Sequence, residues 1–267
     1  AEGGWYDCDK VRFRQGFPEK IGGWSRVSIT TFQGVCRSLW NWTTLGGLNL
    51  VGVGTNLKFY IESGGSYTDI TPVRATVTLT NPFTTQTGAN ANIVTVTDAN
   101  GGYTNGDFVI FAGSGDVGGI AASVLNAEHQ ITYTAGNTYT ITLSQNASSV
   151  ATGGGTVTAA YQINVGPTLS IPLTGWGAGS WGAGSWGSSG ASSYPLRLWS
   201  QANFGEDLIF AQRGGAVYYW QASTGLVNNR AVLLSSLNAG GATPTSTNRI
   251  LVSDVSRFVF CFGANPF

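Results

Sequence analysis

Apolar residues along the chain occur in short runs that are rich in β-branched and aromatic side chains and are bounded mostly by Gly, Asn or Ser. Such runs are typical of β-strands. They predict strands at residues 49–53, 57–61, 108–111, 139–143 and 216–220. Helical periodicity is nowhere sustained, and residues 230–238, which are long enough for two helical turns, fit a strand and a loop equally well. The pattern therefore predicts an all-β fold.

The chain also repeats itself. Residues 39–61 and 198–220 share a leading Leu-Trp, an apolar strand, a Gly and a final aromatic strand. Six positions separate Gly54 from Tyr60 in the first copy and Gly214 from Trp220 in the second, and a third copy begins at Arg249. Each copy predicts antiparallel strands joined by a tight turn, which are part of a propeller blade.

Residues 76–165 differ in composition from the repeats around them. They contain no Lys or Arg, are rich in Thr and carry four acids, Asp98, Asp107, Asp116 and Glu128. A segment of this length with its own turn signals, such as residues 99–102, predicts a small β-sandwich or barrel. We therefore expect a partial β-propeller formed by residues 1–75 and 166–267, interrupted by an inserted β domain at 76–165. The lack of Met and the apolar run just before the last residue suggest a fragment of a longer protein.

Composition narrows the function classes. Thirteen basic and thirteen acidic residues balance, which argues against a chain that coats nucleic acid. The 39 glycines, 12% aromatic and 10% charged residues argue against both a helical and a disordered protein. No run approaches the roughly 20 apolar residues of a membrane helix, so we expect a soluble protein. The odd cysteine count, Cys8, Cys36 and Cys261, predicts reduced, buried thiols of a protein made in a cytosol.

Catalytic and metal-binding motifs are incomplete. The chain has one His, His129, which has no nucleophile motif to serve, and no His/Cys cluster that would hold a transition metal. Glu206 and Asp207 are adjacent, so on a strand they would point to opposite faces, and we expect them to be structural residues at a turn. Residues 114–118 match only the first half of the Asp box of sialidases. We therefore expect no enzyme activity, no catalytic residues, and no cofactor or metal.

Two surface features are candidates for binding. Lys10, Arg12 and Arg14 would share one face of a strand, which suits phosphate or an acidic neighbouring subunit, although a salt-bridged face exposed to solvent explains them as well. Trp176, Trp181 and Trp186 recur every five residues in a Gly-rich stretch. They predict either a loop that packs Trp into pockets or an aromatic surface for carbohydrate or a partner.

The stretch CDKVRFRQGFPEKIGGW at residues 8–24 resembles the opening signature of tail nozzle proteins, also called tail tubular protein B, of short-tailed bacteriophages (podoviruses). The resemblance continues through residues 50–60 and 69–72, the Trp-Gly-Ala-Gly repeat and residues 198–208. It implies a β-propeller with inserted β domains in a structural protein of the virion tail, made in the cytoplasm of the host bacterium.

The resemblance further implies a homohexameric ring that continues the DNA ejection channel below the portal and adaptor and gates it. The expected partners are other copies of the chain, the tail adaptor, tail fibre proteins and genomic DNA that passes without sequence-specific binding, with no small-molecule substrate. Lys10, Arg12 and Arg14 are then expected at subunit or adaptor contacts, and the insertion at the periphery. The alternatives are a carbohydrate-binding, receptor-binding tail component that uses Trp176, Trp181 and Trp186, and a glycan-cleaving tailspike.

Overall fold

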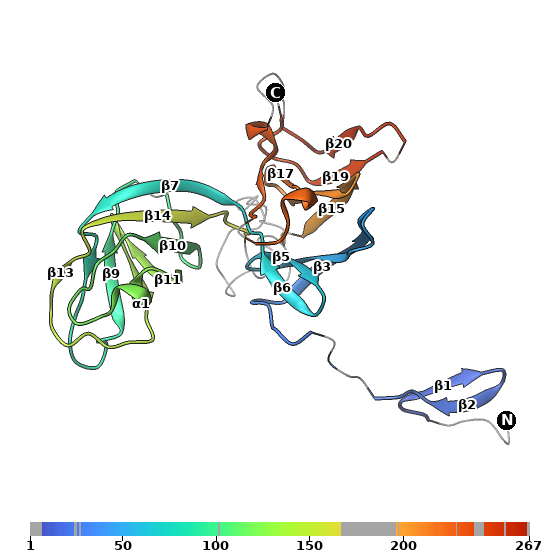
Figure 1. Ribbon diagram of the computed structural model, residues 1–267, viewed down its shortest axis with the longest axis horizontal. Helices are drawn as coiled ribbons and strands as arrows, with labels where there is room; N and C mark the ends of the chain where they lie inside the picture. Colours follow the sequence, from blue (N-terminus) through green and yellow to red (C-terminus); the bar gives the residue numbers. More distant parts are fainter. Residues whose placement is uncertain are drawn as a thin grey trace, which may run out of the picture.

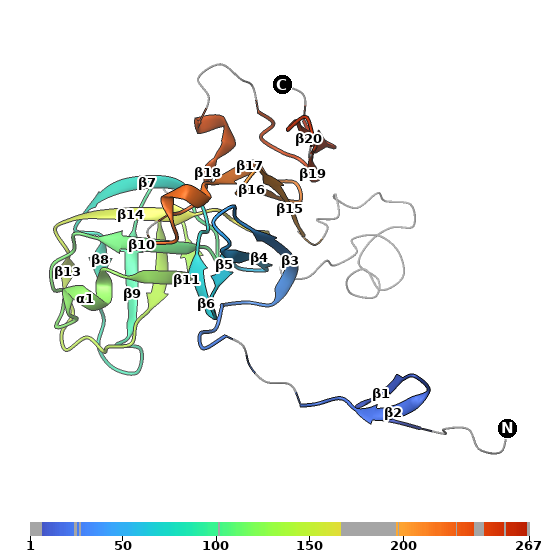
Figure 2. The same ribbon diagram turned by 45° about the vertical axis from the view of Figure 1, so that its right-hand side comes forward.

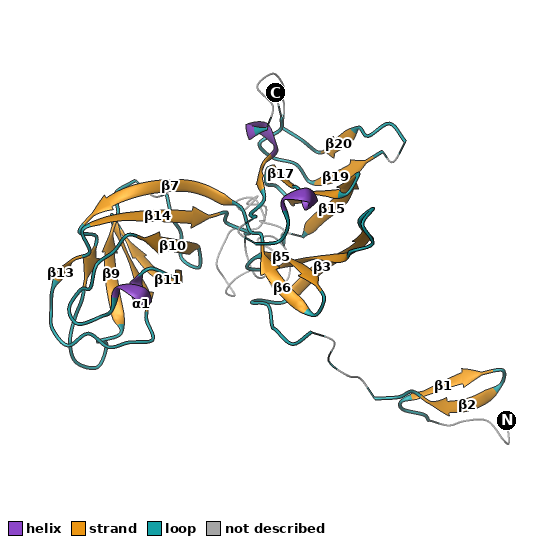
Figure 3. Cartoon of the chain, viewed as in Figure 1, coloured by secondary structure: helices purple, strands orange, loops and turns teal. Residues whose placement is uncertain are grey.

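The computed structural model describes residues 7–23, 26, 28–100, 102–166, 196, 198–227, 229–237, 243–253 and 255–265, without the side chains of residues 133 and 134. Strands dominate this part of the chain, and its α-helix, α1 (Ala122–Leu125), is a single turn (Figure 3). The predicted all-β fold is confirmed. The ambiguous segment at 230–238 contains the short strand β18 (Val232–Leu233) and the 3-10 helix η2 (Leu234–Ser236).

Two four-stranded antiparallel sheets form where the sequence repeats. The first sheet has the order β3 (Cys36–Thr43), β4 (Asn49–Thr55), β5 (Phe59–Ser63) and β6 (Ser66–Asp69). The second sheet has the order β15 (Trp199–Phe204), β16 (Asp207–Gln212), β17 (Val217–Trp220) and β18, with the 3-10 helix η1 (Ala222–Thr224) after β17. The third copy forms the third sheet, a hairpin of β19 (Arg249–Val252) and β20 (Val259–Phe262).

These three sheets stack face to face with the second in the middle (Figure 1). Leu208 and Phe210 of β16 pack on Phe59 of the first sheet, with the rings of Phe59 and Phe210 stacked at 4.0 Å. The alternate residues Ile209 and Ala211 pack toward the third sheet. Strand β16 is therefore apolar on both faces, which explains why its sequence is a continuous apolar run and does not alternate.

Glycines let the first two sheets approach closely. Gly52 and Gly54 of β4 face β15, and a Cβ atom built on Gly54 would lie 2.3 Å from Cδ1 of Trp199. The neighbours Val51 and Val53 point to the opposite face of the first sheet. The Val-Gly-Val-Gly pattern therefore places the bulk of the strand on one face and leaves room for an indole ring on the other.

The segment between the first and second sheets forms one antiparallel eight-stranded sheet of its own, ordered β13-β8-β9-β12-β11-β10-β14-β7. Its strands are β7 (Val73–Thr80), β8 (Phe83–Thr84), β9 (Ile93–Thr97), β10 (Phe108–Ala112), β11 (Glu128–Ala135), β12 (Thr138–Thr142), β13 (Thr152–Gly153) and β14 (Thr156–Gln162). The sheet bends over a single core, in which Phe83 of β8 meets Phe111 of β10 with ring centroids 5.0 Å apart. It does not close into a barrel, because β13 and β7 remain its two ends.

Two sequence expectations differ from this sheet in detail. The predicted hairpin turn at 99–102 is wrong, because β9 pairs with β8 and β12 and not with the following strand β10. Strand β7 begins at Val73, so it crosses the expected boundary between residues 75 and 76. The independence of residues 76–165 as a domain stays a prediction.

A small hairpin of β1 (Val11–Arg14) and β2 (Phe17–Lys20) precedes all of these sheets. Figures 1 and 2 show it projecting away from the rest of the molecule in both views. Backbone hydrogen bonds join its two strands, and the pairing extends beyond them, since Ile21 N donates to Lys10 O at 2.8 Å.

Candidate assembly surfaces

The β1–β2 hairpin carries the nozzle-like signature, and its turn explains part of that sequence. Gln15 and Gly16 join the strands as a two-residue loop, and both have positive φ (52° and 84°). This is the geometry of a type I′ turn, whose twist matches that of paired strands and which favours Gly. The Gly in this loop is therefore required by the hairpin itself.

The register assigns the hairpin's side chains to faces. Arg12 pairs with Glu19 and Arg14 with Phe17, so these four side chains share one face. The Arg12 Nη2 to Glu19 Oε2 distance is 2.9 Å, and both groups are exposed. Lys10 lies before the strand with φ of 56°, and its Nζ is 3.5 Å from Asp9 Oδ2. The prediction that three basic residues share a face is therefore correct for Arg12 and Arg14 and wrong for Lys10, because the left-handed residue breaks the alternation.

The contact of Lys10, Arg12 and Arg14 with a neighbouring subunit or adaptor stays a prediction. The alternative, a salt-bridged face exposed to solvent, agrees with the exposed pair of Arg12 and Glu19. Such a pair contributes only about 0–1 kcal/mol to stability. Trp176, Trp181 and Trp186 lie outside the described residues.

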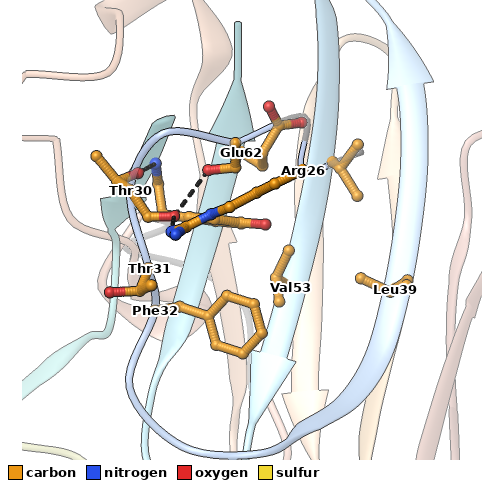
Figure 4. A pocket seen from close by; sticks show the side chains of 10 residues that line it. Arg26, Thr30, Thr31, Phe32, Leu39, Val53 and Glu62 are labelled. Atoms are coloured by element: carbon orange, nitrogen blue, oxygen red, sulfur yellow. Dashed lines mark hydrogen bonds between the residues drawn. The ribbon is translucent and has the colours of Figure 1, made fainter. Parts of the chain in front are cut away.

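A cavity of about 440 Å³ lies on the face of the first sheet that is turned away from the second sheet (Figure 4). One wall is the sheet, with Leu39, Val51 and Val53, and the other is the segment of residues 28–35, here called the strap. Backbone contacts fix the strap to the sheet edge, with Ile29 N to Gly65 O at 2.9 Å. Chain order alone does not predict this cavity, because it forms only where the strap crosses the sheet.

The cavity combines apolar walls with one charge of each sign. The ring of Phe32 lies over it, 5.0 Å from that of Tyr67. The Arg26 guanidinium donates to Thr30 O at 2.8 Å, and the Glu62 carboxylate accepts from Gly65 N at 2.8 Å. Within the described ranges, no group of three or more His, Cys, Asp or Glu is placed to hold a metal. The arrangement suits an apolar side chain flanked by charges.

A second cluster, the junction cluster, joins the eight-stranded sheet to the stacked sheets. Lys58, only 3% exposed, lies 2.9 Å from Asp69 and also pairs with Glu128 of β11. Arg230 after β17 reaches the same two carboxylates at 3.3 and 3.7 Å. Two acids and two bases from three parts of the chain therefore neutralise one another.

The electrostatics of the junction cluster follow from this pairing. Burial alone would raise the pKa of Asp69, but the nearby Lys58 and Arg230 outweigh it and the pKa is lowered. The Lys58 ammonium also lies 4.4 Å from the centroid of the Phe108 ring. The sequence did not predict this cluster. Two features could have indicated it, namely the single Lys within the apolar run 57–61 and the acid Glu128 in a segment without bases.

The groups considered for catalysis have structural contacts. His129 Nε2 lies 3.2 Å from Leu125 O, and burial lowers the pKa of this His. The Asp207 carboxylate accepts from Ala222 N at 2.8 Å and from the Tyr219 hydroxyl, and the Glu206 carboxylate accepts from Leu45 N. The expected position of the Glu206-Asp207 pair at a turn before a strand is confirmed, and these contacts agree with a structural role.

Asp116 of the half-matched Asp box has a structural contact, and two of the three cysteines are exposed. Asp116 Oδ1 accepts from Ala122 N at 2.6 Å, so this carboxylate orients the chain before α1. Cys8 and Cys36 are exposed and Cys261 is half-buried. The prediction of buried thiols is wrong for the first two, because Cys8 precedes the projecting hairpin and Cys36 begins β3 on the solvent side.

Comparisons with known proteins give no family assignment. No protein-family model matches the chain, and no curated protein matches it. Among solved structures, the chain is similar to a phage phi92 endosialidase, with a TM-score of 0.28 and 14% identity. The match covers 83% of this chain and 31% of that chain, so the chain spans about a third of that protein's length. In the part of the chain that the structure describes, no helix has the length and apolarity needed to cross a bilayer.

Proposed function

We propose that this chain is a structural protein of a short phage tail, a subunit of the nozzle ring that continues and gates the DNA channel below the portal and adaptor. The observation that carries the proposal is the separate hairpin at residues 11–20. It is formed by the segment that resembles the nozzle signature, and it projects away from the stacked sheets (Figure 1). Its Arg12, Arg14 and Phe17 are exposed. Projecting elements of this composition are suited to joining subunits.

The stacked sheets support the propeller part of the proposal. Each of the first two is a four-stranded antiparallel meander, and the middle sheet buries both of its faces against neighbours. Consecutive blades of a propeller have this relationship. A nozzle built in this way is a rigid ring component and needs no catalytic group.

The charge of segment 76–165 is compatible with either place in a ring. Every neutralised phosphate adds affinity and therefore opposes sliding. The segment has no Lys or Arg and four acids, so it would bind DNA weakly in the channel, and it suits the periphery equally well. We place it at the outside of the ring, because an insertion between blades leaves from a strand end and the blades already crowd the axis.

Electron cryo-microscopy of the intact virion tests this function. The expected result is density for the stacked sheets in a six-fold ring on the tail axis, between the adaptor and the tip. Density at the tail periphery would contradict the nozzle function and favour the carbohydrate-binding alternative. A glycan array and a polysaccharide depolymerisation assay on the same protein then separate a receptor-binding component from a glycan-cleaving tailspike.

A further inference from the structure

The hairpin presents a face with the composition of a binding hot spot. Phe17 is 74% exposed and stands beside its cross-strand partner Arg14, with Arg12 and Glu19 on the same face. Aromatic residues and Arg are enriched where protein interfaces concentrate their energy. A two-stranded hairpin is marginally stable in water by itself, so packing against another surface stabilises it.

The cavity on the first sheet matches this face. Its apolar wall is open at Leu39, which is 65% exposed, and at the half-buried Val51, whereas Val53 is buried. The volume of about 440 Å³ is ample for one aromatic ring. Glu62 and Arg26 provide one negative and one positive charge beside these walls. The hairpin face likewise carries both signs around Phe17.

We propose that the hairpin of one copy docks into this cavity on a second copy, with Phe17 against Leu39 and Val51 at the open side of the cavity. Arg14 then faces Glu62, and Glu19 faces Arg26. The contact joins two different surfaces of the same chain, so it is heterologous and propagates from copy to copy until a ring closes. The closure of this contact into a ring rests on the proposed nozzle function, whereas the contact between two copies does not.

A second exposed apolar surface fits the hairpin less well. The outward side of the third sheet includes Leu251 and Phe260, but Arg249 lies on β19 and Arg257 in the turn before β20. Between residues 9 and 20 the hairpin carries four bases, Lys10, Arg12, Arg14 and Lys20, against two acids, Asp9 and Glu19. Repulsion between like charges therefore disfavours that surface and leaves the cavity beside Glu62 as the acceptor.

Self-association of the full chain, measured by sedimentation velocity over a concentration series, tests the contact. The wild-type chain is expected to associate. Phe17→Ala is expected to weaken association by at least about 30-fold, the loss typical of a hot-spot residue. Leu39→Asp, at a cavity residue that is 65% exposed, is expected to do the same without unfolding the sheet. The matched control is Phe258→Ala, which removes a 64% exposed ring before β20 and should leave association unchanged.

Mixing the two defective variants tests the head-to-tail geometry. The Phe17→Ala copy keeps an intact cavity and the Leu39→Asp copy keeps an intact hairpin. An equal mixture is therefore expected to form dimers and no larger species, at concentrations where each variant alone stays monomeric. Unchanged Trp fluorescence of both variants confirms that the stacked sheets remain folded.

Several outcomes would overturn the docking proposal. A wild-type chain that stays monomeric up to its solubility limit would do so, as would association lost in Phe258→Ala but kept in Phe17→Ala. A mixture that forms no dimers would also count against it. If the sedimentation experiments fail but microscopy places the chain on the tail axis, the docking proposal is wrong and the nozzle function is retained. If the copies associate as proposed but the chain lies at the tail periphery, the nozzle function is wrong and the docking contact is retained.

Discussion

The eight-stranded sheet and the stacked sheets bury their apolar side chains in different ways. The eight-stranded sheet bends around a core supplied by its own strands and α1, which includes Phe83, Phe111 and Ile141. In the stacked sheets each core is shared between two neighbouring sheets, as where Phe59 of the first sheet and Phe210 of the second stack on each other. The first arrangement allows a segment to fold alone, whereas the second makes each sheet depend on its neighbour.

This difference predicts two cooperative units with separate stabilities. The units meet at the junction cluster, at Ile163 after β14, which packs in the core of the first and second sheets, and at hydrogen bonds such as Gln212 Nε2 to Asn164 O at 3.0 Å. Residues 76–165 contain no Trp, so Trp fluorescence reports only on the rest of the chain. The two units are therefore distinguishable in one unfolding experiment.

The largest effect is expected from Phe210→Ala. It removes a fully buried ring shared by the first and second sheets and should cost about 3–5 kcal/mol of the stability of the stacked sheets. Urea unfolding followed by Trp fluorescence should shift strongly, while hydrogen exchange of the eight-stranded sheet stays protected.

Phe111→Ala is the matched control in the other unit. It should reduce hydrogen-exchange protection in the eight-stranded sheet and leave the Trp transition near its wild-type position. If either substitution shifts both probes equally, the two units unfold as one and the comparison fails.

Asp69→Asn at the junction is expected to have the next largest effect. It should cost roughly 2–3 kcal/mol, less than the loss of a whole buried ion pair, because Glu128 still neutralises Lys58. The pKa of Asp69 is lowered in the folded state, so its stabilisation is present above the ordinary carboxyl pKa and is lost as the pH falls through the folded-state value. Urea midpoints of wild type and variant should differ at pH 7 and converge in acid. A difference that does not depend on pH would contradict the electrostatic explanation.

Gly54→Ala should have a smaller effect, confined to the contact between the first and second sheets. The added Cβ would overlap the Trp199 ring, and such overpacking costs about 1–3 kcal/mol. Trp fluorescence should report both the lower stability and an altered environment of the Trp199 ring. Gly46→Ala is the control, because its Cβ would meet only Thr44 Oγ1 at 3.8 Å.

The smallest effect is expected from Glu19→Gln in the hairpin. The Arg12–Glu19 pair is exposed, so its removal should change the stability of the isolated chain by about 0–1 kcal/mol. Thermal unfolding should therefore barely change. A large loss of stability would show that the hairpin packs on the stacked sheets in solution.

The sequence predicted elements better than it predicted their contacts. Strand 49–53 and the repeated hairpins were visible because β-branched runs and turn glycines act locally. The turn at 99–102 was misassigned, because its glycines look like a hairpin while the partner of β9 is the distant β12. Pairing over such a separation leaves no local signal.

The candidate sites show the same limit. Arg12 and Arg14 could be placed on one face from strand alternation alone. The junction cluster could not be predicted, because Lys58 and Glu128 are seventy residues apart and are brought together only by the packing of the two units. The cavity beneath the strap likewise depends on residues 28–35 crossing a sheet whose strands follow them in the chain.

The pairing of β7 with β14 has a consequence for how this protein changes over evolution. Val73 and Gln162 are register partners, so the eight-stranded unit leaves and rejoins the rest of the chain at neighbouring backbone positions. Exchange of the whole unit for a short turn, or for an unrelated domain with adjacent ends, would keep the backbone path of the stacked sheets, and Lys58 would keep Asp69 as a partner when Glu128 is lost. Related genes are accordingly expected to differ most in the length and content of this segment, and the unit offers a natural place to graft a foreign domain.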